Sequence, residues 1–102
     1  MISNTLIANT NTDILTVPAS TEYASVAILL CNYGASDETL TVYAIPSGGS
    51  ASNTTTIMKN FLLPAGNTYL FDTKLLMSAA DKITVIGAVG GLATATVTYI
   101  AV

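Results

Sequence analysis

The stretch from Val26 to Cys31 reads VAILLC, six apolar residues in succession, and turn-forming residues follow it directly. Successive side chains of a strand point to opposite faces of the sheet. We therefore expect Val26, Ile28 and Leu30 on one face, and the three residues that alternate with them on the other. One face belongs to the core of the domain, and the other requires a cover.

The composition points to an all-β domain with few surface charges. The chain has 102 residues, of which 51% are hydrophobic and 9% are charged, whereas soluble domains typically carry about 25% charged residues. Short apolar runs alternate with clusters of Gly, Pro, Asn, Asp and Ser, a pattern typical of a sandwich or barrel. We expect one β-sandwich domain over residues 1–102.

Eight strands are expected, with no long helix. They span residues 2–8, 13–17, 23–33, 39–45, 55–63, 68–72, 83–89 and 92–102. The third and fourth strands, and the last two, are expected to pair as hairpins because short turn sequences join them. Residues 1–12 are expected to form an extended arm. For the segment Lys74–Ala80, a helical turn and a buried extended run remain alternatives.

The two ends of the chain were considered as targeting segments. Residues 83–102 carry no charge and are long enough to span a bilayer as a helix. However, Gly90 and Gly91 interrupt this segment, and Thr then alternates with apolar residues at the period of a strand. We favour the hairpin over the membrane helix. The N-terminus lacks the basic region and long apolar run of a signal peptide, so we do not expect export by that route.

Charge and residue types narrow the function classes. The net charge is −3, there is no Arg or His, and the three Lys residues are scattered, so we do not expect nucleic-acid binding. The absence of His excludes Ser-His-Asp and Cys-His catalysis within this chain. Cys31 is the only cysteine, which excludes an internal disulfide, and we interpret it as a small buried hydrophobe.

The remaining candidate sites have structural interpretations. Asp37 and Glu38 are interpreted as solvated turn residues rather than a catalytic pair. Asp72 and Asp81 could approach each other, but no calcium-loop pattern is present. The loop 46–54 lacks the ending of a phosphate-binding loop. The aromatic residues are interpreted as core and cross-strand packing. We expect no catalytic residue, no metal ion and no cofactor.

The apolar second face of the strands indicates assembly. Exposing three large apolar side chains would forgo about 1.5–3 kcal/mol each, and the whole stability of a small domain is about 5–15 kcal/mol. A neighbouring subunit is therefore the expected cover. The residues predicted to lie in an assembly interface are Ile2, Leu6, Ile7, Ile14, Leu15, Tyr43 and Ile45.

Four segments carry a resemblance to a known group of proteins. They are Val17–Gly34 (VPASTEYASVAILLCNYG), Val42–Ser52 (VYAIPSGGSAS), Leu63–Thr68 (LPAGNT) and Leu75–Val85 (LLMSAADKITV). Together they resemble small structural proteins of tailed bacteriophages. That pattern often has Gly before the Asp of its DKI element, where this chain has Ala80.

The resemblance implies a β-sandwich of immunoglobulin-like or jelly-roll kind that is built into a virion. We expect a capsid decoration (cement) protein, made in the host cytoplasm, that sits as a homotrimer on the capsid exterior and bridges major capsid subunits. The alternative is a small neck, tail or fibre-base component. A glycan- or receptor-binding module is less favoured, and an enzyme is least favoured. Partners are other copies, the major capsid protein or another virion protein, with no nucleic acid and no membrane.

Overall fold

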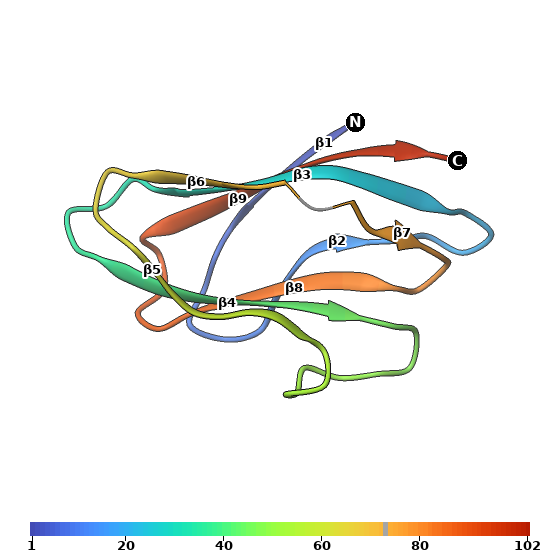
Figure 1. Cartoon of the computed structure of the whole chain (residues 1–102), viewed down its shortest axis with the longest axis horizontal. Helices are drawn as coiled ribbons and strands as arrows, with labels where there is room; N and C mark the ends of the chain where they lie inside the picture. Colours follow the sequence, from blue (N-terminus) through green and yellow to red (C-terminus); the bar gives the residue numbers. More distant parts are fainter. Residues whose placement is uncertain (73) are drawn as a thin grey trace.

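The computed structural model describes residues 1–72 and 74–102. It contains nine strands in two antiparallel sheets that face each other (Figure 1). The strands are β1 (Ile2–Leu6), β2 (Thr12–Thr16), β3 (Tyr23–Asn32), β4 (Glu38–Ile45), β5 (Thr56–Leu63), β6 (Thr68–Phe71), β7 (Leu76–Met77), β8 (Lys82–Gly87) and β9 (Ala93–Ala101). The all-β sandwich predicted from the sequence is confirmed, and no helix occurs in the described residues.

The strand order is that of a jelly roll. Sheet A has the order β1-β9-β3-β6, with the short β7 also paired to β3, and sheet B has the order β2-β8-β4-β5. Only the steps from β4 to β5 and from β6 to β7 stay within one sheet, so every other connection crosses between the sheets. Eight long strands wound in this way form the double-sheet jelly roll, the second of the two sandwich types expected.

Each predicted strand lies within a few residues of an observed one, but the two predicted hairpins are wrong. β3 belongs to sheet A and β4 to sheet B, and β8 and β9 are separated in the same way. The connections after β3 and after β8 cross the depth of the sandwich instead of reversing the chain within one sheet (Figure 1). Turn-forming residues occur both in hairpins and in connections that cross between sheets, so the local sequence does not distinguish the two kinds of connection.

The structure decides between the alternative conformations predicted for two segments, residues 83–102 and residues 74–80. Residues 83–102 form most of β8 and all of β9 rather than a helix. The described part of the chain contains no helix with the length and apolar character needed to cross a bilayer. In the segment 74–80, Leu76–Met77 form β7 and pair with β3, so the extended alternative is the observed one.

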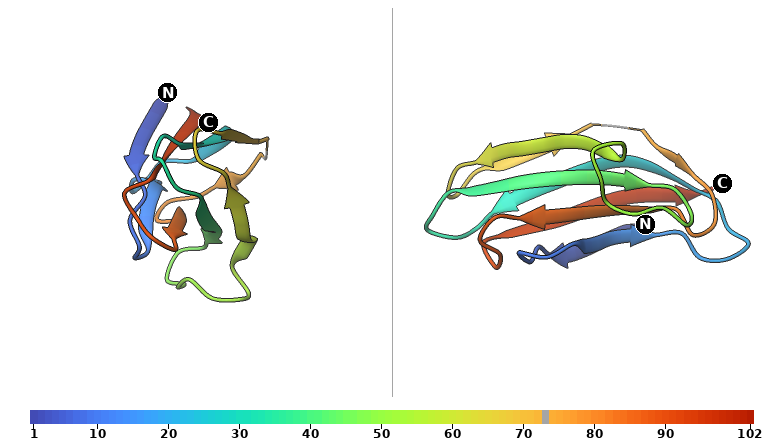
Figure 2. Two further views of the ribbon diagram at one scale, coloured as in Figure 1. Left: turned by 90° about the vertical axis from the view of Figure 1, so that its left-hand side faces the viewer. Right: turned by 90° about the horizontal axis from the view of Figure 1, so that it is seen from below.

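The expected N-terminal arm is not free. β1 pairs along its whole length with β9, from Ile2 opposite Thr98 to Leu6 opposite Thr94. It runs obliquely from the level of sheet A toward sheet B, across one open side of the sandwich (Figures 1 and 2). The next residue, Ile7, is 1% exposed and belongs to the core. Residues 1–12 are therefore part of the folded domain, because their apolar residues and backbone find partners within this chain.

The core fills the space between the two sheets with aliphatic side chains. Its buried members are Ile7, Ile14, Leu15, Val17, Ile28, Leu30, Leu40, Val42, Leu63, Met77, Ile83, Val85, Ala93, Ala95 and Val97. Aromatic rings extend this packing. The rings of Phe61 on β5 and Tyr69 on β6 have centroids 4.4 Å apart, and those of Tyr23 and Tyr99 are 4.6 Å apart. Phe61 and Tyr69 thus connect the edge strands of the two sheets, as predicted for core and cross-strand aromatic packing.

The stretch VAILLC alternates as predicted except at its first residue. Ile28 and Leu30 are fully buried in the core, whereas Val26 and Leu29 are exposed. The pairing of β3 with β9 shifts register between Ser25 and Ala27, which marks a β-bulge at Val26. The extra residue of a bulge breaks the two-residue period. Val26 therefore does not join Ile28 and Leu30 in the core.

Candidate interaction surface

The outward side of sheet A is an uncharged surface, which we call the neutral face. It consists of Ile2, Asn4 and Leu6 on β1, Ala24, Val26, Ala27, Leu29 and Cys31 on β3, Thr68 and Leu70 on β6, Leu76 on β7, and Thr94, Thr96, Thr98 and Ile100 on β9. Register places most of these residues side by side: Asn4 is opposite Thr96, Thr96 is opposite Leu29, and Leu29 is opposite Leu70. None of these residues carries a charge.

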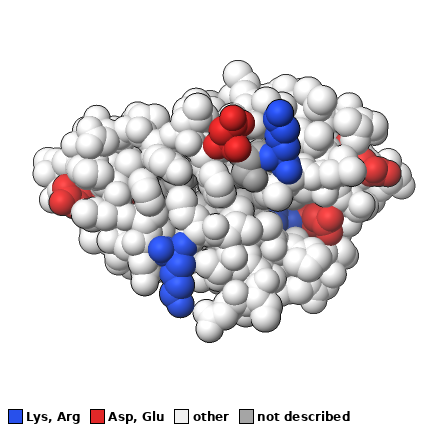
Figure 3. Space-filling view, viewed as in Figure 1, with Lys and Arg blue, Asp and Glu red and all other residues white. Residues whose placement is uncertain are grey.

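Large apolar side chains are exposed across the neutral face. Those exposed most are Leu76 at 75%, Ile2 at 65%, Leu6 and Leu70 at 53% each, and Ile100 at 51%. Single exposed apolar residues are ordinary, but a contiguous apolar surface marks an interaction site. Figure 3, which views the molecule from the side, shows acidic and basic residues as small spots, some of them side by side, on a mostly uncharged surface.

The neutral face has the dimensions of an interface. Its four main strands have 5, 9, 10 and 4 residues, and at about 3.4 Å per residue and about 4.8 Å between strands they cover on the order of 450 Å². A standard protein interface buries about 800 Å² on each partner. The neutral face therefore supplies more than half of the area that a standard interface buries.

Part of the outward side of sheet B is covered by the chain itself, although Leu62 on β5 remains 55% exposed there. The loop 46–55 lies on the side of sheet B that faces away from sheet A (Figure 1). Ile45 points to this side, opposite Lys82 in the register, and is nevertheless only 3% exposed. A Cβ atom on Gly49 of the loop would lie 3.4 Å from Cγ2 of Ile45. The loop 46–55 therefore packs on Ile45.

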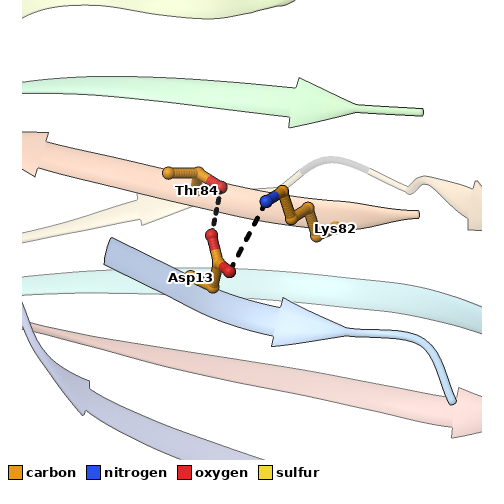
Figure 4. A network of polar contacts seen from close by, with 3 residues as sticks. All are labelled: Asp13, Lys82 and Thr84. Atoms are coloured by element: carbon orange, nitrogen blue, oxygen red, sulfur yellow. Dashed lines mark hydrogen bonds and ion pairs between the residues drawn. The ribbon is translucent and has the colours of Figure 1, made fainter. Parts of the chain in front are cut away.

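Polar contacts occupy another part of this side of sheet B. The hydroxyl of Thr84 donates a hydrogen bond to Oδ1 of Asp13 at 2.8 Å, and Nζ of Lys82 lies 3.6 Å from Oδ2 of the same carboxylate. Figure 4 shows these three side chains together on β2 and β8. Sheet B thus carries charged groups and intramolecular hydrogen bonds where sheet A carries exposed aliphatic side chains.

The structure divides the predicted interface residues into two groups. Ile2 and Leu6 are exposed on the neutral face, and Tyr43 is half-buried on sheet B. The other four are covered by this chain: Ile7, Ile14 and Leu15 by the core and Ile45 by the loop 46–55. These four have no surface to offer a neighbour, so we remove them from the interface. Sequence reasoning did not single out Leu29, Leu70, Leu76 or Ile100 as interface residues, because only the strand pairing places them on one face.

The environment of Glu38 differs most from the one predicted from the sequence. It was interpreted as a solvated turn residue, but its side chain is 1% exposed at the start of β4. Its carboxylate accepts hydrogen bonds from the backbone N–H groups of Thr39 at 2.9 Å, Val89 at 3.1 Å and Gly90 at 2.9 Å. Charge-assisted bonds of this kind make a buried carboxylate tolerable. Glu38 thereby fixes the connection between β8 and β9.

Asn32 has the same role at the end of β3, and no pattern in the sequence pointed to it. Its side-chain amide donates to the carbonyls of Ser36 at 2.8 Å and Leu63 at 3.0 Å, and its Oδ1 accepts from the N–H of Gly34 at 3.0 Å. The fully buried amide thus stabilises the connection that crosses from sheet A to sheet B.

Two further acidic residues, Asp37 and Asp81, also accept hydrogen bonds from the backbone of this chain. Oδ1 of Asp37 accepts from the N–H of Ala65 at 3.1 Å. Asp81 accepts from the N–H of Ser47 at 2.8 Å and of Ser78 at 2.9 Å. In the described residues no group of three or more Asp, Glu, Cys or His side chains could hold a metal ion. The contacts of Asp37 and Asp81 stabilise turns and loops.

No family model, no curated protein and no solved structure matches this chain. The two outward sides of the sandwich and the resemblance of the four sequence segments are therefore the observations that bear on function.

Proposed function

We propose that this protein is a structural component of a bacteriophage virion, and that it decorates the capsid exterior. In this role the neutral face packs against the shell, and the protein stabilises the particle by bridging major capsid subunits. The observation that carries the proposal is the uncharged, aliphatic outward side of sheet A. A surface of this kind gains about 25 cal/mol for each Å² of apolar area removed from water.

The fold and the sequence support the same proposal. Double-sheet jelly rolls are frequent in viral capsid proteins, although a fold alone does not determine function. The segments Val17–Gly34 and Leu75–Val85, which resemble phage structural proteins, contribute β3, β7 and part of β8. β3 is the central strand of the neutral face, so the resemblance covers the surface that we assign to the shell.

The experiment is the identification and counting of this chain in purified particles. Quantitative mass spectrometry on virions should find hundreds of copies for a shell protein that bridges capsid subunits. A few to a few dozen copies would move the protein to the neck, tail or fibre base. Absence of the chain from the particles, or its complete loss on a mild wash, would overturn the proposal.

The homotrimer implied by the resemblance is part of this proposal. Native mass spectrometry of the protein released from particles would show a three-fold species or a multiple of it. Deletion of residues 1–12 is a poor test of attachment, because it removes β1 and the core residue Ile7. Single substitutions on the neutral face leave the core intact and are preferable.

A further inference from the structure

The free edge of β1 is open to another strand. Met1 donates from its amino group to the carbonyl of Tyr99 at 2.7 Å and accepts from the N–H of Tyr99 at 2.9 Å, and the N–H of Ile7 bonds to Ala93 at 2.9 Å. In an antiparallel ladder, alternate residues direct both backbone groups toward the neighbouring strand. Odd-numbered residues of β1 therefore bond to β9, and Ile2, Asn4 and Leu6 direct their N–H and C=O groups away from it.

The other sheet edges carry the features that prevent strand addition. β2 contains Asp13 and a register shift, and β5 contains Lys59, register shifts and Asn60 at φ +52°. β6 is only four residues long. Charges, bulges and short strands are the usual protection of edges. β1 has no register shift in its pairing with β9. Residues 1–12 include no proline and no charged side chain.

We infer that β1 pairs with β1 of a second copy of this chain, antiparallel about a two-fold axis at Asn4. In this register Asn4 lies opposite Asn4 of the other copy, and Ile2 lies opposite its Leu6. All three residues direct their backbone groups to the edge, so the seam is closed by about six main-chain hydrogen bonds. The two A sheets become one continuous sheet.

The strand is complementary to itself in side chains as well as backbone. Ile2 and Leu6 lie on the same face and are both more than half exposed, so each meets an aliphatic partner across the seam. No like charges meet, because the strand has none. The side chain of Asn4 accepts a hydrogen bond from the hydroxyl of Thr96 at 2.7 Å, which holds it on the neutral face. This contact goes beyond the proposed function and does not depend on it.

A charge swap at Asn4 tests the two-fold axis. Asn4→Lys and Asn4→Asp each bring two like charges to directly opposed positions, about 5.5 Å apart between Cα atoms. Each variant alone should associate at least about tenfold more weakly than the native chain. An equimolar mixture should recover association, because Lys then meets Asp. Asn4→Ala, which loses the bond to Thr96 and adds no charge, is the matched control and should associate as the native chain does.

Sedimentation velocity over a wide concentration range gives the readout, and thermal unfolding confirms that each variant is folded. A native dimer, or a hexamer in which the two-fold contact joins two trimers, supports the inference. A native monomer, an isolated trimer, or a mixture that remains dissociated would overturn it. A dimer that fails to bind particles would refute the proposed function alone, and an isolated trimer that binds them would refute this inference alone.

Discussion

The outward sides of the two sheets differ in how far intramolecular contacts cover their side chains. On sheet B the loop 46–55 covers Ile45, and Asp13, Lys82 and Thr84 satisfy one another. On sheet A, Leu70, Leu76 and Ile100 are exposed, and the residues that make up the neutral face carry no charge. Intramolecular contacts thus cover part of the outward side of sheet B, whereas the large aliphatic side chains of sheet A remain exposed in the single chain.

The largest expected effect separates two leucines of matched exposure. Leu70 on β6 lies on the neutral face and is 53% exposed, and Leu62 on β5 lies on the outward side of sheet B and is 55% exposed. Leu70→Lys should weaken binding to undecorated capsids about thirtyfold or more, because an unpaired ammonium buried in an interface costs about 2 kcal/mol or more. Cosedimentation with capsids measures the effect.

Leu62→Lys is the control for this prediction and should change binding less than about twofold, because surface charges outside an interface contribute little. Equal losses in both variants would mean that the two sides of the sandwich do not differ, and the comparison would fail. Both proteins should unfold at nearly the native temperature, since neither leucine belongs to the core.

The second prediction concerns apolar residues that the sequence treats alike. Ile45→Ala should destabilise the free chain by about 2–4 kcal/mol, because it removes a side chain that the loop 46–55 has buried. Leu76→Ala should change the stability by less than about 0.5 kcal/mol, because Leu76 is 75% exposed in the free chain. Urea denaturation measures both. A similar cost at the two sites would show that the neutral face is already covered within one chain.

The third prediction tests whether the carboxylate of Glu38 stabilises the connection between β8 and β9. Glu38→Gln should destabilise the chain by about 2 kcal/mol, because one carboxylate oxygen is replaced by an NH₂ group that faces backbone donors. The exposed Glu22 provides the control, and Glu22→Gln should have an effect below about 0.5 kcal/mol. If both changes are neutral in urea denaturation, the carboxylate of Glu38 does not fix the β8–β9 connection.

The smallest expected effect is a gain in stability. Ala80 has φ +68°, a left-handed conformation that costs a non-glycine residue about 1–2 kcal/mol. The adjacent Asp81 holds Ser47 of the loop that covers sheet B. Ala80→Gly should stabilise the chain by about 0.5–1 kcal/mol in thermal or urea unfolding. Ala79→Gly, at a neighbouring position without positive φ, should be destabilising instead. The reverse order would contradict the strain assigned to Ala80.

The position of each strand could be predicted from the sequence, because the apolar runs and turn residues act locally. The pairing of strands could not, since the residues after Asn32 and after Gly87 are compatible with a hairpin as well as with a crossing between sheets. The resemblance marked position 80 as a site where glycine is usual, and the positive φ there gives the physical reason.

The candidate surface was only partly predictable, for the same reason. Alternation within VAILLC correctly placed Ile28 and Leu29 on opposite faces without indicating which face is the core, and the bulge at Val26 has no local signature. Ile45 and Leu29 look equivalent in the sequence, and only the folded loop 46–55 distinguishes them. Glu38 resembled an ordinary turn carboxylate, because its three backbone donors come from its own neighbour and from residues about fifty positions away.

Cys31 provides a direct measurement of whether the neutral face is covered. It lies on this face between Thr94 and Thr68, is partly exposed in the free chain, and is the only cysteine. The rate at which a maleimide modifies Cys31 should be compared between the free chain and particles that carry it. We predict a rate at least about tenfold lower on the particles, because a packed interface excludes the reagent. Equal rates, with the chain still bound to the particles, would contradict the claim that the outward side of sheet A is the surface of assembly.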